Sequence, residues 1–357
     1  MNTWLEKDSF APLLNMVSIP NGMEPSEDRN DIVRALEAIH RVMPGKLEEL
    51  IETINKTDDD KISCVIADLG KAWAIQVAEK LRIQRVAFWS ATAASLSPVL
   101  SIQRVPLHKN TFQLLPTMPP MSSAEFGWTL GPLLASNRLA KQVGHLWKED
   151  TTCLEWLDQQ PTRSVIYVAF GSFTILNQIQ FQELALGLEL TKQPFLWVVR
   201  PGIITERSDT YPEGYMDRIG TRGKIVTWAP QQAVLAHPSI MCFLSHCGWN
   251  STLEGMSHGV PFLSWPYFVD QLLNTTYICD IWKIGLRFEK DEDGTIKKDE
   301  IKGKVDQVVN NNEFRTKALD LKEKVMNNAG EDGYKNFKRF VEWMKKEDDN
   351  GKNDSKT

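Results

Sequence analysis

The segment that decides the fold runs from Trp228 to Gln271 and reads WAPQQAVLAHPSIMCFLSHCGWNSTLEGMSHGVPFLSWPYFVDQ. Residues 240–244 and 260–265 are apolar and predict two strands, and the polar stretch beginning at Asn250 predicts a helix start between them. His246 follows the first of these strands almost directly. Because ligands of parallel α/β sheets bind at the carboxyl ends of strands, this edge is a candidate site.

The alternation of apolar strands with helical segments continues on both sides of this segment. Residues 164–170, 195–199 and 224–227 are apolar and alternate with helical periodicity, which is typical of βαβ units. Strands this apolar belong in the middle of a parallel sheet, so helices must cover both faces. Residues 314–325 and 337–344 predict amphipathic helices, and the polar residues 345–357 predict a disordered tail.

The first half of the chain has a thinner pattern. Only residues 13–19, 62–67 and 85–89 predict strands, and one helix is predicted around Leu47, Leu50, Ile51 and Ile54. Residues 101–161 contain repeated prolines without a clear βα unit, which is too long for an ordinary loop. We therefore expect two domains, with the boundary near Gly131 and the first domain incomplete.

Composition excludes several classes of protein. The chain has 357 residues, 42% of them hydrophobic and 24% charged, as in ordinary globular proteins. Its formal charge of −5 offers no basic field for nucleic acid or anionic lipid. The longest apolar run, residues 165–170, is far too short to span a bilayer, and no secretory signal is visible. Five cysteines without a CxxC pair predict free thiols, so we expect a cytosolic protein.

The helix start after His246 suits an anion. A helix N-terminus presents unpaired N–H groups and a positive dipole end, so a diphosphate could bind there without a metal, assisted by His246, Asn250 and Ser251. Alternatives stay open: Ser251 and Glu254 also match a capping box. The His and Cys residues of this segment also suggest zinc, but Cys242 lies within an apolar strand. Trp228 could be a core residue or could stack on a base.

The 44-residue segment resembles the signature of the plant family-1 UDP-dependent glycosyltransferases, with its HCGWNS core and closing Asp-Gln pair. SVIYVAFGS and GPLL resemble the second domain of that family, and CVIAD followed by AWAIQVAEKL resembles part of the first. The resemblance implies an α/β protein of the GT-B type, with two Rossmann-like domains and parallel sheets. It assigns residues 1–130 to a partial acceptor domain and residues 131–344 to the donor domain.

The resemblance also implies an activity, namely inverting, metal-independent transfer of glucose from UDP-glucose to a hydroxyl of a small acceptor. No cofactor is implied beyond the UDP-sugar substrate, and we expect a monomer. Trp228 would stack on uracil with Ala229 and Gln231 near the uridine, and Glu254 would hold the ribose. The phosphates would be faced by Ser172, His246, Asn250 and Ser251. The sugar would be bordered by Trp249, Asp270 and Gln271, where a terminal Gln is associated with glucose.

The first domain departs from the family pattern. The family's general-base histidine lies in a GHxxP-type loop, and no such loop occurs in this sequence. Asp68 matches the acidic residue that orients this histidine, and is thus the remaining catalytic candidate, although it could instead cap the helix of residues 71–81. A carboxylate is a poor base toward an alcohol at neutral pH. The alternative function is therefore a noncatalytic UDP-sugar-binding fragment.

Overall fold

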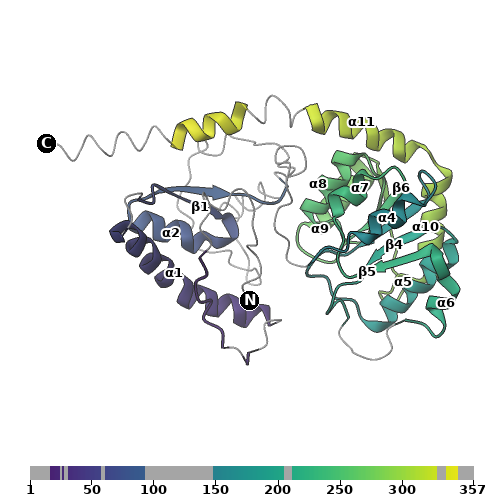
Figure 1. Ribbon diagram of the computed structural model, residues 1–357, viewed down its shortest axis with the longest axis horizontal. Helices are drawn as coiled ribbons and strands as arrows, with labels where there is room; N and C mark the ends of the chain where they lie inside the picture. Colours follow the sequence, from purple (N-terminus) through teal and green to yellow (C-terminus); the bar gives the residue numbers. More distant parts are fainter. Residues whose placement is uncertain are drawn as a thin grey trace. The chain divides into compact units, whose positions relative to one another are not determined.

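The computed structural model describes residues 17–24, 26–27, 31–57, 61–92, 148–204, 211–327 and 335–344. The chain forms two compact units, one of Met1–Leu130 with Gly333–Thr357 and the other of Gly131–Asp332 (Figure 1). The predicted GPLL boundary and the tail of residues 345–357 lie outside the described residues. The described helix at residues 335–344 groups with the first unit.

The second unit is built on a six-stranded parallel sheet. Its strand order is β5-β4-β3-β6-β7-β8, so the chain moves outward from β3 to β5 and then returns to pair β6 with the other edge of β3. The order therefore reverses between β3 and β6. The strands are β3 (Val165–Ala169), β4 (Phe195–Val198), β5 (Gly223–Val226), β6 (Ile240–Ser245), β7 (Phe262–Ser264) and β8 (Gly285–Arg287).

Helices accompany the strands of this unit, as the βαβ pattern predicts (Figure 1). A 3₁₀ turn at Gly220–Arg222 precedes β5, and a π-helical turn at Tyr277–Ile281 precedes β8. The α-helices are α4 (Thr152–Asp158), α5 (Gln178–Thr191), α6 (Tyr215–Ile219), α7 (Gln231–Ala236), α8 (Trp249–His258), α9 (Gln271–Thr276), α10 (Lys298–Asn310) and α11 (Glu313–Asn327).

Both faces of this sheet are buried. Successive side chains of a strand point to opposite faces. Ile166 and Val168 accordingly join one buried cluster with α5 and α10, whereas Val165 and Tyr167 join another with α4, α7, α8 and α11. Every residue of β3 is buried. Since each large apolar side chain contributes about 1.5–3 kcal/mol on burial, these two clusters fix the strands whose ends form the site.

The first unit is smaller in its described part. It contains α1 (Ile32–Thr57), β1 (Cys64–Asp68), a 3₁₀ turn at Leu69–Lys71, α2 (Ala72–Lys80) and β2 (Gln84–Phe88). The parallel strands β1 and β2 form a two-stranded sheet. Trp73 and Ile75 of α2 pack in a small cluster with Ile39 and Leu47 of α1.

The α/β class with parallel sheets is confirmed, with three differences in detail. Strand β8 is additional to the predicted strands. Helix α1 is much longer than predicted and continues through Pro44. Residues 17–19 of the first predicted strand are not in a strand, and the remainder of that prediction lies outside the described residues.

Candidate functional site

The candidate site lies where the strand order reverses. The loops that leave β3 and β6 begin at Phe170 and His246 and run toward different neighbours, because β3 continues to β4 on one side and β6 continues to β7 on the other. In open parallel sheets this divergence leaves a crevice at the carboxyl ends of the strands. Polar residues of the Trp228–Gln271 segment therefore gather at this edge of the sheet.

His246 is held between two glycines. A Cβ placed on Gly171 would lie 2.5 Å from its Nε2, and a Cβ on Gly248 would lie 2.6 Å from the same atom. Gly171 also has φ +66°, which disfavours any other residue there. Burial lowers the pKa of His246 to about 4, so the imidazole is neutral at pH 7. The ring therefore joins the two loops without carrying a charge.

Helix α8 begins with unsatisfied backbone groups. Gly248 is its N-cap residue, and no side chain caps the first turn. The capping-box alternative for Ser251 and Glu254 is wrong, because Ser251 lies inside the helix rather than at its N-cap. The first N–H groups of α8 thus remain available to an anion, and Asn250 lies exposed in this first turn.

A polar network joins α7, α8 and β3. The Gln231 side chain donates from Nε2 to Ser251 Oγ at 3.0 Å and to Glu254 Oε2 at 2.7 Å. Gln232 Nε2 donates to the other Glu254 oxygen at 3.2 Å, and the Tyr167 hydroxyl donates to Gln231 Oε1 at 3.1 Å. Glu254 is thus placed by two amides rather than by a cation, which leaves lone pairs for further hydroxyl donors.

Trp228 and Ala229 connect β5 to α7. The Trp228 carbonyl accepts a hydrogen bond from Asp150 N at 2.9 Å, and its half-buried indole packs against the cluster on the α7 and α8 face. Ala229 is buried. This loop also leaves the carboxyl end of a strand, so the structure places Trp228 at the same edge of the sheet as His246.

The end of the segment is tied to the loop after β6. Asn274 Nδ2 donates to the Cys247 carbonyl at 2.9 Å and to Asp270 Oδ2 at 2.8 Å, and Cys247 has a left-handed φ of 62°. The Gln271 Oε1 accepts from Tyr267 N and Phe268 N, at 2.8 and 3.1 Å. The side-chain oxygen of Gln271 is therefore committed to its own loop, and the amide group of that side chain remains for a ligand.

Known proteins resemble this chain over most of its length. A family model described as UDP-glucoronosyl and UDP-glucosyl transferase matches residues 140–327. The chain is 38% identical to UDP-glycosyltransferase 83A1 of Arabidopsis thaliana over 95% of this chain and 86% of that protein. The chain belongs to the plant UDP-glycosyltransferases.

The alignment with UDP-glycosyltransferase 83A1 has 410 positions against the 357 residues of this chain, so at least 53 positions of the relative have no counterpart here.

Solved structures give this glycosyltransferase the same fold. Os79 from O. sativa, in complex with UDP, matches with a TM-score of 0.76 at 26% identity, over 89% of this chain and 85% of that chain. A UDP-glucosyltransferase from Polygonum tinctorium matches with a TM-score of 0.73 at 26% identity, over 92% and 86%. The GT-B architecture inferred from the signature is thereby confirmed.

Asp68 of the glycosyltransferase ends β1 in the first unit. Its Oδ1 accepts from Gly70 N at 2.8 Å and thus caps the 3₁₀ turn that leads into α2. Its Oδ2 accepts from Ser90 Oγ at 2.6 Å. Asp68 therefore caps the 3₁₀ turn and not, as the capping alternative predicted, the helix of residues 71–81, because the N-cap of α2 is Lys71.

Four of the six histidines of the glycosyltransferase are described, and of these four only His40 belongs to the first unit, which contains Asp68. His40 contacts the Leu36 carbonyl, His237 lies between Asp158 and Ser239, and His258 contacts the Glu254 carbonyl. His108 and His145 lie outside the described residues. Within the described part of the first unit, Asp68 is therefore not paired with an imidazole.

The five cysteines are free thiols, as predicted. Cys242 belongs to the buried cluster on one face of the sheet and Cys247 to the cluster on the other. These two thiols therefore do not share a site, and the described residues contain no group of three potential metal ligands. Among the described helices, none combines the length and apolarity needed to cross a membrane.

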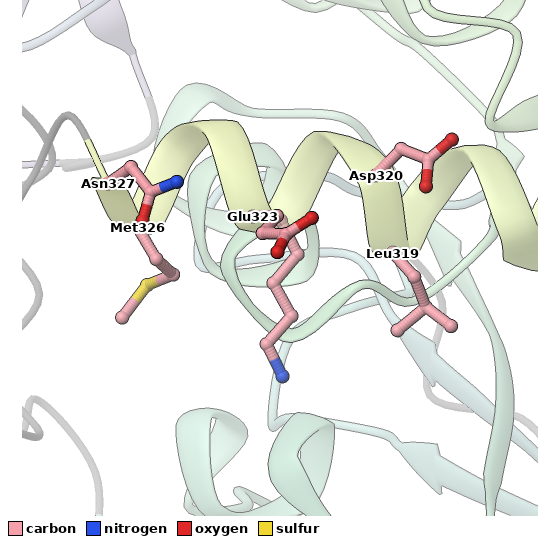
Figure 2. A pocket seen from close by; sticks show the side chains of 6 residues that line it. Leu319, Asp320, Glu323, Met326 and Asn327 are labelled. Carbon is pink, nitrogen blue, oxygen red and sulfur yellow. The ribbon is translucent and has the colours of Figure 1, made fainter.

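Sequence reasoning missed Gln232 and Asn274, and it also missed Arg200, whose Nε donates to the Gly171 carbonyl at 3.1 Å. Gln232 is adjacent to Gln231, and Arg200 is a charged residue that directly follows an apolar strand, so both carried a visible signal. Figure 2 shows a pocket whose six lining residues all belong to α11, and none of them is a predicted site residue. Charged and apolar side chains of one helix do not form a nucleotide site, so this pocket is not a candidate for UDP binding.

Proposed function

We propose that the protein transfers glucose from UDP-glucose to a hydroxyl of a small acceptor, with inversion and without a metal. The observation that carries this proposal is the Glu254 network beside the uncapped N-terminus of α8, at the reversal of the strand order. Relatives support it, since Os79 was solved with UDP and the Polygonum tinctorium enzyme is capable of glucosylating indoxyl.

The uridine lies against the loop after β5. Trp228 stacks on the uracil, and Ala229 and Gln231 border the nucleoside. Glu254 accepts hydrogen bonds from the ribose hydroxyls, because its two amide partners leave part of its acceptor capacity unused. A carboxylate is a stronger acceptor than a neutral oxygen, so this contact anchors the nucleoside.

The diphosphate lies at the first turn of α8. Backbone N–H groups there, together with Ser172, His246, Asn250 and Ser251, offer hydrogen-bond donors, and the helix dipole favours negative charge. Because His246 is neutral at pH 7, its contribution is a hydrogen bond or a packing contact rather than an ion pair. These groups stabilise the UDP that leaves during transfer.

The sugar lies beside Trp249, Asp270 and Gln271. The Gln271 oxygen is occupied by backbone N–H groups, so its amide N–H groups donate to sugar hydroxyls, while Asp270 accepts from them. Asn274 holds the Asp270 carboxylate in place. The glucose preference rests on the terminal Gln271 and is tested by comparing UDP-glucose with UDP-galactose.

In the transfer step an acceptor oxygen forms a bond to the anomeric carbon while the bond from that carbon to the UDP oxygen breaks. The electron pair of the broken bond leaves with UDP, and the acceptor proton must pass to a base. Asp68 is the acceptor-side candidate for a role in this proton transfer.

The alternative, a UDP-sugar-binding protein without transfer, is favoured by the engagement of both Asp68 oxygens with Gly70 and Ser90. We place the protein in the cytosol, since none of its five cysteines forms a disulfide. We also propose that it acts as a monomer.

The nucleotide assignment is tested by calorimetry with UDP and 2′-deoxy-UDP. The wild-type protein should bind UDP more tightly than the deoxy form, because a hydrogen bond to a charged group contributes about 1.5–3 kcal/mol. In Glu254→Gln and Glu254→Ala the preference for the ribose hydroxyl should shrink or vanish. Glu300→Gln on α10 is the control, since Glu300 also accepts a hydrogen bond but from Glu289 N.

A wild-type protein that does not bind UDP would overturn the proposed function. If UDP binds but the preference for ribose survives in both Glu254 variants, the nucleotide site stands and the role of Glu254 is wrong. Thermal melts of each variant separate loss of folding from loss of contact.

A further inference from the structure

We propose that Arg200 is a positioning residue for the diphosphate, a role that rests on the proposed function and extends it beyond the signature segment. Arg200 follows β4 and is 7% exposed. Its guanidinium fixes the turn after β3, and this turn contains Ser172. The residue lies outside the Trp228–Gln271 segment and belongs to none of the sequence motifs that indicate the family.

The contacts of Arg200 are all with backbone carbonyls. Its Nε donates to the Gly171 carbonyl at 3.1 Å, its Nη2 donates to the Thr174 carbonyl, and its Nη1 donates to the Pro201 carbonyl at 3.3 Å. The guanidinium thus bridges two carbonyls three residues apart in one turn. Its rigid planar fork holds these donors in fixed directions, whereas the three donors of an ammonium group rotate at the end of a flexible stem.

These contacts set the direction of the opposite N–H groups. All described peptide bonds are trans, and in a planar trans peptide the C=O and the following N–H point in opposite directions. Since the Gly171 carbonyl points at Arg200, the Ser172 N–H points away from it. The Ile175 N–H is oriented in the same way by the Thr174 carbonyl. Arg200 therefore turns N–H groups outward on the far side of the turn.

The turn also contacts the loop after β6. Gly171 lies against His246, so the position of this glycine determines how the two loops meet. Among the described residues Arg200 has no carboxylate partner, so its positive charge lies behind the turn without being neutralised there. Because His246 is neutral at pH 7, the positive charge beside this turn is that of Arg200, on the carbonyl side of the Gly171 and Thr174 peptides.

The test is the ratio of UDP affinity to uridine affinity, measured by calorimetry on Arg200→Met and Arg200→Lys. Uridine lacks the diphosphate, so a residue that positions phosphate-facing groups should change this ratio, whereas general loss of structure should weaken both ligands. We expect Arg200→Met to weaken UDP about tenfold while uridine changes less than about twofold. Arg200→Lys keeps the charge and loses the fork, so it should lower the ratio by a smaller factor.

Arg315 supplies a matched control. It is half-buried, and thus less buried than Arg200, but it likewise donates to two backbone carbonyls, those of Gly259 and Ile240, at 3.1 and 3.5 Å. Ile240 begins β6, however, so Arg315 lies at the opposite end of the sheet from the site. Arg315→Met should lower the melting temperature and leave the ratio of UDP to uridine affinity unchanged.

A wild-type protein without UDP affinity would overturn the proposed function and this inference with it. Wild-type UDP binding with an unchanged ratio in Arg200→Met would overturn the role of Arg200 alone. If Arg200→Met does not fold, Arg200→Lys decides the matter: a ratio equal to that of the wild type would reject the positioning role, and a lower ratio would support it.

Discussion

Among the described residues, the pair β1 and β2 and the pair β3 and β6 both end in or are soon followed by polar residues, and of these two pairs only β3 and β6 span a reversal of the strand order. At the ends of β1 and β2, Asp68 and Ser90 bond to each other. At the ends of β3 and β6, the polar groups are distributed over two separate loops and a helix N-terminus. The same local rule, an apolar strand followed by polar residues, therefore gives two different structures.

Connectivity explains the difference. Strands β1 and β2 are joined through α2 and lie next to each other, so no change of direction separates their ends. Strands β3 and β6 are adjacent in space but separated in the chain by β4 and β5, so the loops that follow them diverge. Polar residues after a strand are therefore a stronger indication of a ligand site where the strand order reverses, as it does between β3 and β6.

The two sheets also differ in burial. All five residues of β3 are buried, whereas Ile66 in β1 is 55% exposed and Phe88 at the end of β2 is 39% exposed. A two-stranded sheet covers less apolar surface than a six-stranded sheet with helices on both faces. Within the described residues the second unit is therefore the more completely packed, and we expect it to bind UDP independently of the first unit.

The largest expected effect is on the rate of glucose transfer, which tests the difference between the first and the second unit. The 357-residue chain should bind UDP but transfer glucose to phenols and small alcohols only slowly. A chain into which a family-type segment with a GHxxP histidine is grafted should transfer glucose at least about 10²–10⁴-fold faster, because general-base catalysis supplies that factor. In the grafted chain, Asp68→Asn should lower turnover again without changing UDP affinity. The measurements are product formation and calorimetry.

Asp291→Asn is the control for that experiment. Asp291 accepts a hydrogen bond from the N–H two residues ahead, as Asp68 does, but it lies in the loop between β8 and α10. Rapid transfer by the ungrafted chain would contradict the prediction and require another base. Equal losses in Asp68→Asn and Asp291→Asn would reduce Asp68 to a turn-capping residue.

The sequence predicted the fold well where burial is complete. Continuous apolar runs identified β3 and β6, since a strand buried on both faces leaves no polar alternation. Strand β8 escaped prediction because its three residues, Gly285–Arg287, carry too little apolar pattern. The network around Glu254 was only partly predictable: its anchor Tyr167 is 64 residues from Gln231 and meets it only through the sheet.

An intermediate effect on UDP affinity is expected at Trp228. It tests whether the uracil ring binds at the strand ends of the second unit. Trp228→Ala should cost about 1–3 kcal/mol of UDP binding, the range for a base stacked on an aromatic side chain. Trp282→Ala is a suitable control, because Trp282 packs against the same buried cluster from the turn before β8. If Trp228→Ala binds UDP as tightly as the wild type, and both Trp228→Ala and Trp282→Ala are less stable, then Trp228 is a core residue and does not stack on uracil.

The smallest effect is expected at His246, whose contribution to UDP affinity should not depend on pH near neutrality. Because burial lowers the pKa of His246 to about 4, the imidazole stays neutral from about pH 5.5 to about pH 8. The ratio of UDP affinities in the wild type and His246→Gln should then be constant over this range, since titration of UDP itself cancels. A ratio that rises as the pH falls would show that His246 becomes a cation and pairs with the diphosphate.

The same shift predicts the sign of a stability change. The unfolded chain binds a proton at His246 near pH 6.5, whereas the folded chain does so only near pH 4, so the unfolded state takes up the proton first as the pH falls. The contribution of this neutral histidine to the free energy of unfolding is therefore fully present above about pH 6.5 and decreases toward pH 4. Denaturant unfolding should show a steeper loss of stability across that window in the wild type than in His246→Gln, and parallel curves would mean that the imidazole is open to water.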